Sequence, residues 1–290
     1  MKQLTLKSPA KLNLYLEILN KRPDGFHNLR TIFERIGLCD EITLRARSDK
    51  RVRIICNHPL VPRGSSNLAW RAAKALKHAL KIDKGIDIII KKNIPPASGL
   101  GGGSSNAASV LWGLNRFWRL GLSEKQLLKY ARKLGSDTAF FIHRTTFALG
   151  ASRGEKIRPL KRLKHKFWHI LVVPRKQIST KLAYQLWDKN KSLRLTTPRR
   201  NVKIILLALQ QNSLKAFAQG LYNAFTLISE RLCPDILEIK SKLKALEIEA
   251  VSISGKGPAV FGIVSTRKEA MRHKRQLKTK GWSVFAVSTF

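Results

Sequence analysis

The chain of 290 residues has few cysteines and no long apolar run. Its three cysteines, Cys39, Cys56 and Cys233, are far apart and form no CxxC pair, which argues against a disulfide framework and a cysteine-rich metal site. No run of about 18 apolar residues predicts a membrane span, and Met1–Ser8 lacks the apolar core of a secretory signal. We therefore expect a cytoplasmic protein with reduced thiols and no metal site built from its own side chains.

Acidic residues are also scarce, because 18 Asp and Glu stand against 56 Lys and Arg, giving a formal net charge of +38. Such a field attracts polyanions and raises their rate of encounter. Nucleic acids are polyanions, but so are ATP and diphosphate substrates, so the charge alone selects no partner. The basic residues are spread along the whole chain, which is typical of a solvated surface. A non-specific affinity for nucleic acid therefore stays open beside a small-molecule substrate.

The spacing of the apolar residues predicts a mixed α+β chain. Ser123 and Gln126 form a capping box that is expected to begin a helix, and strands 41–47 and 51–56 are expected to pair. The expected strands are 4–6, 11–19, 41–47, 51–56, 86–90, 147–151, 167–174, 250–254, 259–264 and 284–288. The expected helices are 67–79, 104–118, 124–134, 181–187, 202–211, 213–225, 236–246 and 268–278. We divide the chain into domains 1–158 and 159–290, with a ligand cleft between them.

A glycine-rich segment, IPPASGLGGGSSN at residues 94–106, is the sharpest local feature. Its four glycines allow positive φ and a close approach of the backbone to a ligand. The segment runs from a predicted strand into the start of a predicted helix, where free N–H groups and the helix dipole favour phosphate. It lacks the GK[ST] ending of a Walker A loop and the context of a dinucleotide-binding GxGxxG. A flexible turn is the simpler alternative for a glycine-rich segment taken alone.

The ordered string at residues 94–106 resembles the phosphate loop of the GHMP kinase superfamily. Three further pieces occur in the order typical of the branch that phosphorylates 4-diphosphocytidyl-2-C-methyl-D-erythritol in the non-mevalonate route to isoprenoids. They are SPAKLNL at 8–14 with RPDGFH at 22–27, LGSDTAFF at 134–141, and SGKGPAVF at 254–261. The resemblance implies the two-domain GHMP kinase fold. Residues 1–158 would form an ATP-binding half like domain 2 of ribosomal protein S5, and residues 159–290 an α/β substrate-binding half.

By this resemblance Lys11 and Asp137 are the catalytic residues, with ATP as co-substrate accompanied by Mg²⁺. Lys11 would hold a positive charge beside the reacting hydroxyl and the γ-phosphate, and Asp137 would accept the hydroxyl proton. A carboxylate beside a lysine stays ionised at pH 7, as a base requires. Read without the resemblance, Lys11 is an exposed strand lysine and Asp137 is a helix-capping carboxylate.

The resemblance also implies the binding residues. Asn67 would face the adenosine of ATP, although an asparagine at this position equally suits a helix N-cap. The remaining predicted ATP-binding residues are Pro95, Pro96, Ala97, Ser98, Gly99, Leu100, Gly101, Gly102, Gly103, Ser104 and Ser105. For the acceptor, His27 would hydrogen-bond the cytosine edge, Phe26 would line its pocket and Tyr184 would stack on the base. Asn13 and Thr180 would hold the erythritol, and Gly255 and Gly257 would let a C-terminal loop approach it.

Four positions depart from the pattern of the resembled family. Thr138 and Ala139 follow Asp137 where Val-Pro is usual, and the loss of the proline is expected to loosen the loop. Ser152 stands where glycine is common, and Lys256 replaces a small hydroxyl residue, adding a cation near the expected diphosphate. Two rival functions stay open. One is a sister GHMP kinase acting on another alcohol or a sugar, and the other is a basic nucleic-acid-binding protein on the same fold.

Overall fold

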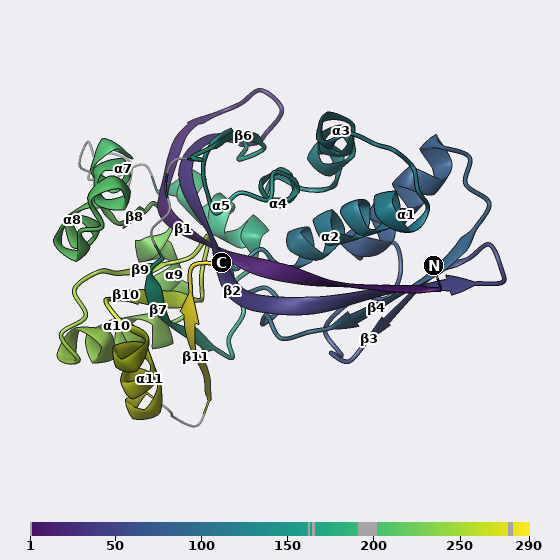
Figure 1. Ribbon diagram of the computed structural model, residues 1–290. Coiled ribbons are helices and arrows are strands. Elements are labelled where there is room, and N and C mark those ends of the chain that lie inside the picture. The colour runs from purple at the N-terminus through teal and green to yellow at the C-terminus, as the bar shows by residue number, and fades with distance from the viewer. Residues whose placement is uncertain (1, 162, 164–165, 191–201, 278–280) are drawn as a thin grey trace.

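The computed structural model describes residues 2–161, 163, 166–190, 202–277 and 281–290, which form two β-sheets and the helices that cover them (Figure 1). The strands are β1 Gln3–Lys21, β2 His27–Arg47, β3 Val52–Cys56, β4 Gly85–Lys91, β5 Phe147–Ser152, β6 Lys156–Pro159, β7 Trp168–Pro174, β8 Tyr222–Asn223, β9 Val251–Ile253, β10 Val260–Val264 and β11 Trp282–Ser288. The helices are α1 Leu68–Ala79, α2 Gly102–Phe117, α3 Glu124–Leu134, α4 Thr138–Ile142, α5 Thr180–Lys189, α7 Val202–Gln211, α8 Leu214–Gly220, α9 Thr226–Leu232, α10 Asp235–Ala245 and α11 Arg267–Gln276.

The larger, seven-stranded sheet is ordered β3-β4-β2-β1-β8, with β5 paired to β2 and β6 paired to β5. Helices α1 to α4 lie over one face of it, and their apolar sides form a core with the inward residues of β2 and β4 (Figure 1). On β4, Ile86, Ile88 and Ile90 are fully or almost fully buried in this core, as the period-two alternation of a strand requires. The predicted helix 124–134 and its capping box at Ser123 are confirmed.

The predicted pairing of strands 41–47 and 51–56 is wrong. Strand β4 lies between them, antiparallel to β2 and parallel to β3. Helix α1 connects β3 to β4, and a helical crossover of this kind returns the chain parallel to the strand it left. We expected a hairpin because only a short segment separates β2 from β3. The sequence of two strands gives no other indication of which strands are neighbours in the sheet.

The long strands β1 and β2 were only partly predicted. Strand β1 runs without a break across Pro9, where the register against β2 shifts by a bulge instead of ending the strand. Strand β2 extends from His27, so the stretch 27–40 was missed. Charged residues interrupt its apolar pattern there, yet Glu34 is fully buried because His169 and Thr289 from the second half contact the same carboxylate oxygen at 2.8 and 2.7 Å.

The second, four-stranded sheet is ordered β11-β7-β10-β9 and is antiparallel throughout. Helices α10 and α11 pack against it (Figure 1). The predicted helix 213–225 is too long, because α8 ends at Gly220 and β8 then pairs in parallel with β1. A Cβ on Gly220 would lie 2.9 Å from the Ile205 side chain of α7, so the glycine allows these helices to pack closely. Elements α4, β6 and α9 were not predicted, and residue 278 of the predicted last helix lies outside the described residues.

The two halves share an apolar core rather than meeting at a polar interface. Leu12 and Ile32 of the first sheet belong to the same buried cluster as Leu171 and Phe261 of the second. This cluster fixes the sheets against each other on one side of β1, while the opposite side of β1 faces the cavity described below. Within the described part of the chain, no helix combines the length and apolar character needed to cross a membrane.

Candidate active site

A cavity of about 1020 Å³ is lined by residues of both halves of the chain. One end, here called the glycine-loop end, is formed by residues 95–104, together with Asn67 and Lys11. The other, here called the aromatic end, is formed by Phe26, His27, Tyr184 and Asp188. The cavity thus brings together segments that are up to about 240 positions apart, since Gly255 and Lys256 line it as well.

The glycine loop runs directly into the N-terminus of α2, with Gly101 as the N-cap residue at φ +70°. A Cβ on Gly101 would lie 3.0 Å from the Lys11 side chain, and the Lys11 N–H donates to the Leu100 carbonyl at 3.0 Å. Gly101 therefore makes room for Lys11 against the loop. The first N–H groups of α2 have no partner in the preceding turn of a helix and are available to an anion.

A buried carboxylate holds the glycine loop from behind. Asp40 is 1% exposed and accepts from the backbone N–H groups of Asn93 and Ile94 at 2.8 and 2.9 Å and from the Asn106 amide at 2.9 Å. The Lys92 ammonium forms an ion pair with the same carboxylate. Asp40 thus ties the strand that enters the loop to the helix that leaves it. Sequence reasoning missed Asp40, because a single acid within a strand carries no distinctive spacing.

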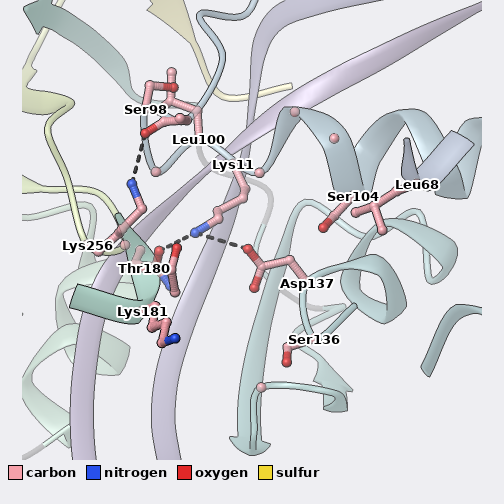
Figure 2. A pocket seen from close by; sticks show the side chains of 18 of the residues that line it. Lys11, Leu68, Ser98, Leu100, Ser104, Ser136, Asp137, Thr180, Lys181 and Lys256 are labelled. Atoms are coloured by element: carbon pink, nitrogen blue, oxygen red, sulfur yellow. Dashed lines mark hydrogen bonds and ion pairs between the residues drawn. The ribbon is translucent and has the colours of Figure 1, made fainter. Parts of the chain in front are cut away.

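Lys11 and Asp137 meet in the middle of the cavity. The Lys11 Nζ lies 3.4 Å from an Asp137 carboxylate oxygen and also donates to the Asn13 side-chain oxygen (Figure 2). Lys11 is 3% exposed, so the reading of an exposed strand lysine is wrong. The Asn13 amide donates to Thr31 at 2.8 Å, which orients the oxygen that receives the lysine.

Asp137 precedes α4 but its side chain makes no capping hydrogen bond. The interpretation as a helix-capping carboxylate is therefore wrong, and the carboxylate, whose side chain is 31% exposed, is open to the cavity. The following Thr138 is fully buried and its N–H donates to the Gly135 carbonyl at 3.1 Å. The turn before α4 is thus held by a backbone hydrogen bond and by burial, without the proline that is usual in the resembled family.

The aromatic end is built from contacts among its own side chains. The rings of His27 and Tyr184 stack with centroids 5.1 Å apart and planes 22° from parallel. The His27 Nε2 lies 2.7 Å from Asp188, which also pairs with Lys21 at 2.6 Å. Burial opposes the ionisation of Asp188, but the hydrogen bonds from Lys21 and His27 outweigh it and lower the pKa of this carboxyl.

Phe26 stands apart from this cluster. Its side chain is 52% exposed, and the Arg153 guanidinium lies 4.9 Å from the centre of its ring. Such a cation–π contact orients an exposed ring.

Ser152 is a neighbour of this end of the cavity, and its hydroxyl accepts a hydrogen bond from Arg22 at 2.9 Å. Ser152 has a φ of +62°, a conformation that favours glycine, which accounts for glycine being common at this position in the resembled family.

The C-terminal loop 254–259 is fastened to the glycine loop. The Ser254 hydroxyl donates to the Gly99 carbonyl at 3.0 Å, and the Ala259 N–H donates to the Ser98 carbonyl at 3.1 Å. A Cβ on Gly99 would lie 2.1 Å from the Ser254 carbonyl oxygen, which leaves no space for any side chain. Gly255 and Lys256 of this loop reach the cavity.

Most predicted site residues line this one cavity, but Ser105 and Gly257 do not. Ser105 is fully buried, and its hydroxyl accepts a hydrogen bond from Ser8 at 2.8 Å, so only Ser104 of this pair faces the ligand space (Figure 2). Gly257, within the loop 254–259, is also buried. Thr180 begins α5 at the edge of the cavity.

Asn67 serves as the N-cap of α1. Its side-chain oxygen accepts from the N–H groups of Ala69 and Trp70 at 2.8 and 3.4 Å, and its amide nitrogen donates to the Pro62 carbonyl at 2.7 Å. The protein itself therefore uses both ends of this amide, although Asn67 also lines the cavity.

Asp188 and Arg153 are among the cavity residues that the sequence reasoning did not place in the site. Asp188 follows a predicted helix as an ordinary acid, and only the fold brings it to His27. Among the described residues, no group of three or more His, Cys, Asp or Glu is arranged to hold a metal ion. The oxygen atoms beside the Lys11 ammonium belong to the Asn13 amide and the Asp137 carboxylate, and the Ser104 hydroxyl lies farther along the cavity (Figure 2).

Comparison with known proteins agrees with this geometry. The family description "GHMP kinases N terminal domain" matches residues 67–145, and "GHMP kinases C terminal" matches residues 205–282. The 4-diphosphocytidyl-2-C-methyl-D-erythritol kinase of Geobacter metallireducens is 41% identical over 99% of each chain, and that of Geobacter sulfurreducens is 41% identical over 100% of each. A crystal structure of 4-(cytidine 5'-diphospho)-2C-methyl-D-erythritol kinase, 29% identical, covers 99% of this chain and 100% of its own with a TM-score of 0.81.

These relationships confirm the predicted GHMP kinase fold and the α+β class. They also confirm the resemblance that the motifs carry, since the relatives align from end to end with this sequence. The chain therefore belongs to the 4-diphosphocytidyl-2-C-methyl-D-erythritol kinase family of the GHMP kinases, which are ATP-dependent phosphotransferases.

Proposed function

We propose that this kinase transfers the γ-phosphate of ATP to the 2-hydroxyl of 4-diphosphocytidyl-2-C-methyl-D-erythritol, giving the 2-phosphate and ADP. The observation that carries the proposal is the Lys11–Asp137 pair, 3.4 Å apart, between a glycine loop and a cluster of aromatic side chains in one cavity. A loop suited to phosphates at one end and rings suited to a base at the other match the two substrates of this reaction.

Asp137 accepts the proton of the acceptor hydroxyl as that oxygen attacks the γ-phosphorus. The new O–P bond forms while the bond from the γ-phosphorus to the bridging oxygen of ADP breaks, and that oxygen leaves with its electron pair. Lys11 neutralises charge that spreads over the transferred group, and the Asn13 oxygen holds the ammonium in place. Phosphoryl transfer depends mainly on such alignment and charge neutralisation.

For ATP, the phosphates lie along residues 95–104 and the free N–H groups of α2, and the adenosine lies towards Asn67. Mg²⁺, when bound, neutralises charge between the β- and γ-phosphates. The described residues offer no carboxylate cage for it, so the nucleotide phosphates and waters would supply most of its ligands, with Ser104 as the protein oxygen.

For the acceptor, the cytosine lies at the aromatic end. A neutral His27 that donates its Nε2–H to Asp188 leaves Nδ1 as an acceptor, which suits the amino group of cytosine. Phe26 and Tyr184 supply stacking surfaces. Asn13 and Thr180 hold the erythritol, while Gly255 and Gly257 shape the loop that approaches it.

The test is an ADP-release assay with ATP and the cytidine acceptor, run on the wild type and on Asp137→Ala. We expect turnover by the wild type, a loss of about 10²–10⁴-fold in kcat for the variant, and a phosphorus NMR signal of a new phosphomonoester at the 2-position. A wild type without turnover defeats the proposed reaction. Equal turnover by both proteins defeats the role of Asp137.

The choice of acceptor separates this reaction from that of a sister kinase acting on another alcohol. His27→Ala should raise the KM for the cytidine acceptor by about tenfold and leave the KM for ATP unchanged, because His27 lies at the aromatic end. An unchanged KM for the acceptor would favour the sister kinase.

We also propose a cytoplasmic location, which the three free thiols support. The net charge of +38 supports a non-specific attraction for nucleic acid beside catalysis. Electrostatic binding of this kind weakens steeply with salt, so RNA retained by the protein at low salt should be released at high salt. RNA binding that persists at high salt would instead favour the nucleic-acid-binding alternative.

A further inference from the structure

We propose that the Lys256 ammonium binds phosphate oxygens of the substrates, as a cation additional to Lys11. This inference rests on the proposed function for the identity of the substrates, and on the geometry of one loop for the binding group. The ligand chemistry is a nucleoside diphosphate or triphosphate, which either the cytidine acceptor or ATP supplies.

Lys256 reaches the cavity from the loop 254–259, between Gly255 at φ +56° and Gly257 at φ +74°. Its Nζ donates to the Ala97 carbonyl at 2.9 Å and to the Gly257 carbonyl at 3.2 Å. An ammonium has three N–H donors, so one donor is left over, and no partner for it is found among the described residues. The side chain thus spans from the C-terminal loop to the glycine loop with one donor to spare.

The charge of Lys256 is not compensated in the described part of the chain. The carbonyls that contact it are neutral, whereas three other lysines of the cavity, all nearer to its acidic side chains, have carboxylate partners. These ion pairs are Lys11 with Asp137, Lys92 with Asp40 and Lys21 with Asp188. A half-buried cation without a counter-charge is unfavourable, and a bound phosphate would supply the missing negative charge.

The Lys256 loop also packs against the catalytic lysine. A Cβ on Gly255 would lie 3.4 Å from the Lys11 Nζ, so this loop and the Lys11 ammonium are in contact distance of each other. Figure 2 shows Lys256 beside Ser98 and on the other side of Lys11 from Asp137. An anion seated against Lys11 is therefore within the reach of a side chain that carries a second positive charge.

The first test measures binding by calorimetry, with CDP, cytidine, ADP and adenosine as probes. The proteins are the wild type, Lys256→Gln and Lys256→Arg. Glutamine keeps a donor for the Ala97 carbonyl but removes the charge, whereas arginine keeps the charge. We expect Lys256→Gln to weaken the binding of at least one of the two diphosphates by about tenfold, as for a hydrogen bond between charged groups, and to leave both nucleosides unchanged. Lys256→Arg should stay within about threefold of the wild type.

The probes also identify the source of the phosphate. A loss for CDP but not ADP assigns Lys256 to the acceptor, and a loss for ADP but not CDP assigns it to ATP. Unchanged affinity for both diphosphates overturns the inference. So does an equal loss for nucleosides and diphosphates, because Lys256 would then only fasten the two loops.

A matched control removes the same charge far from the cavity. Lys50 is 74% exposed and pairs with Asp83, and Lys50→Gln should bind every probe like the wild type. If Lys50→Gln weakens the diphosphates as much as Lys256→Gln does, the net charge of the protein is responsible and the inference falls. Because these readouts need no turnover, a wild type without kinase activity would defeat the proposed reaction and leave the binding role of Lys256 standing.

A pH profile gives an independent check. Burial, with a further contribution from Lys11, lowers the pKa of Lys256 to about 8. The charged groups that share the cavity with it are Lys11 and Lys21 on β1, Lys92 after β4, Asp137 before α4, Arg153 after β5, and Lys181 and Asp188 on α5, together with the titratable side chains of His27 and Tyr184. Since Lys256 is charged below its pKa, affinity for the diphosphate should fall as the pH rises from 7 to 9. This fall should be absent in Lys256→Gln, and a fall of equal size in the variant contradicts the inference.

Discussion

At the glycine-loop end of the cavity, positions are set by the backbone and by buried side chains, whereas at the aromatic end they are set by contacts among side chains that range from the buried His27 to the exposed Phe26. Gly101 leaves room for Lys11, and Asp40 holds the loop from behind with 1% of its surface exposed. In contrast, Phe26 is 52% exposed, and His27 depends on Asp188 for its orientation. The first end should therefore be damaged by adding atoms, and the second by removing a partner.

The largest effect is expected where the two ends meet. Lys11→Met removes the positive charge beside Asp137 but keeps a side chain of similar length. We expect kcat to fall by about 10²–10³-fold, as for the loss of one group that stabilises the transition state. The KM for the acceptor should change less than kcat. Steady-state kinetics measure both, and a thermal melt like that of the wild type excludes unfolding.

A kcat within about threefold of the wild type would contradict the role of Lys11. Lys50→Gln serves again as the control for a change in net charge, because it lies outside the cavity.

The next effect concerns the glycine-loop end alone. In Gly99→Ala the new Cβ would meet the Ser254 carbonyl oxygen at 2.1 Å, and the residue would have to adopt a φ of +85°. The backbone strain of such a conformation costs about 1–3 kcal/mol, and relief of the clash requires the two loops to move apart. We expect the KM for ATP to rise by more than tenfold.

Gly121→Ala is the matched control, because its φ is +67° and a Cβ there would meet nothing within 4 Å. It shares the backbone penalty without the clash, so its KM for ATP should equal that of the wild type. An equal KM for ATP in Gly99→Ala and Gly121→Ala would show that ATP binding at the glycine-loop end does not depend on the close packing of the two loops.

The aromatic end should respond to the loss of one partner. Asp188→Asn removes the charge that orients His27 and pairs with Lys21. We expect the KM for the cytidine acceptor to rise by about tenfold, which corresponds to about 1.4 kcal/mol, with the KM for ATP unchanged. Asp83→Asn, which breaks an exposed pair with Lys50, is the control. A rise in the KM for ATP equal to that for the acceptor would remove the distinction between the two ends.

The sequence was most informative where function depends on a continuous string. The glycine loop, Lys11 and Asp137 lie in motifs, and apart from Ser105 their predicted residues line the cavity. It was least informative where single residues from distant elements meet. Asp40 and Asp188 have no distinctive neighbours in the chain, yet the fold makes one the support of the loop and the other the partner of His27. The strand order likewise escaped prediction, since the place of β4 between β2 and β3 depends on a crossover through α1.

The smallest effect tests whether Asn67 belongs to the glycine-loop end at all. Serine is as good an N-cap as asparagine, so Asn67→Ser keeps the hydrogen bonds to the first turn of α1 but loses the amide that donates to Pro62. If Asn67 acts only as the cap, the thermal melt and the KM for ATP should both stay close to the wild type. Asn67→Ala should lower the free energy of unfolding by about 1 kcal/mol through loss of the cap. A KM for ATP that rises severalfold in Asn67→Ser, with stability retained, would instead mean that the amide contacts the nucleotide, and Asn67 would then be both a cap and a ligand.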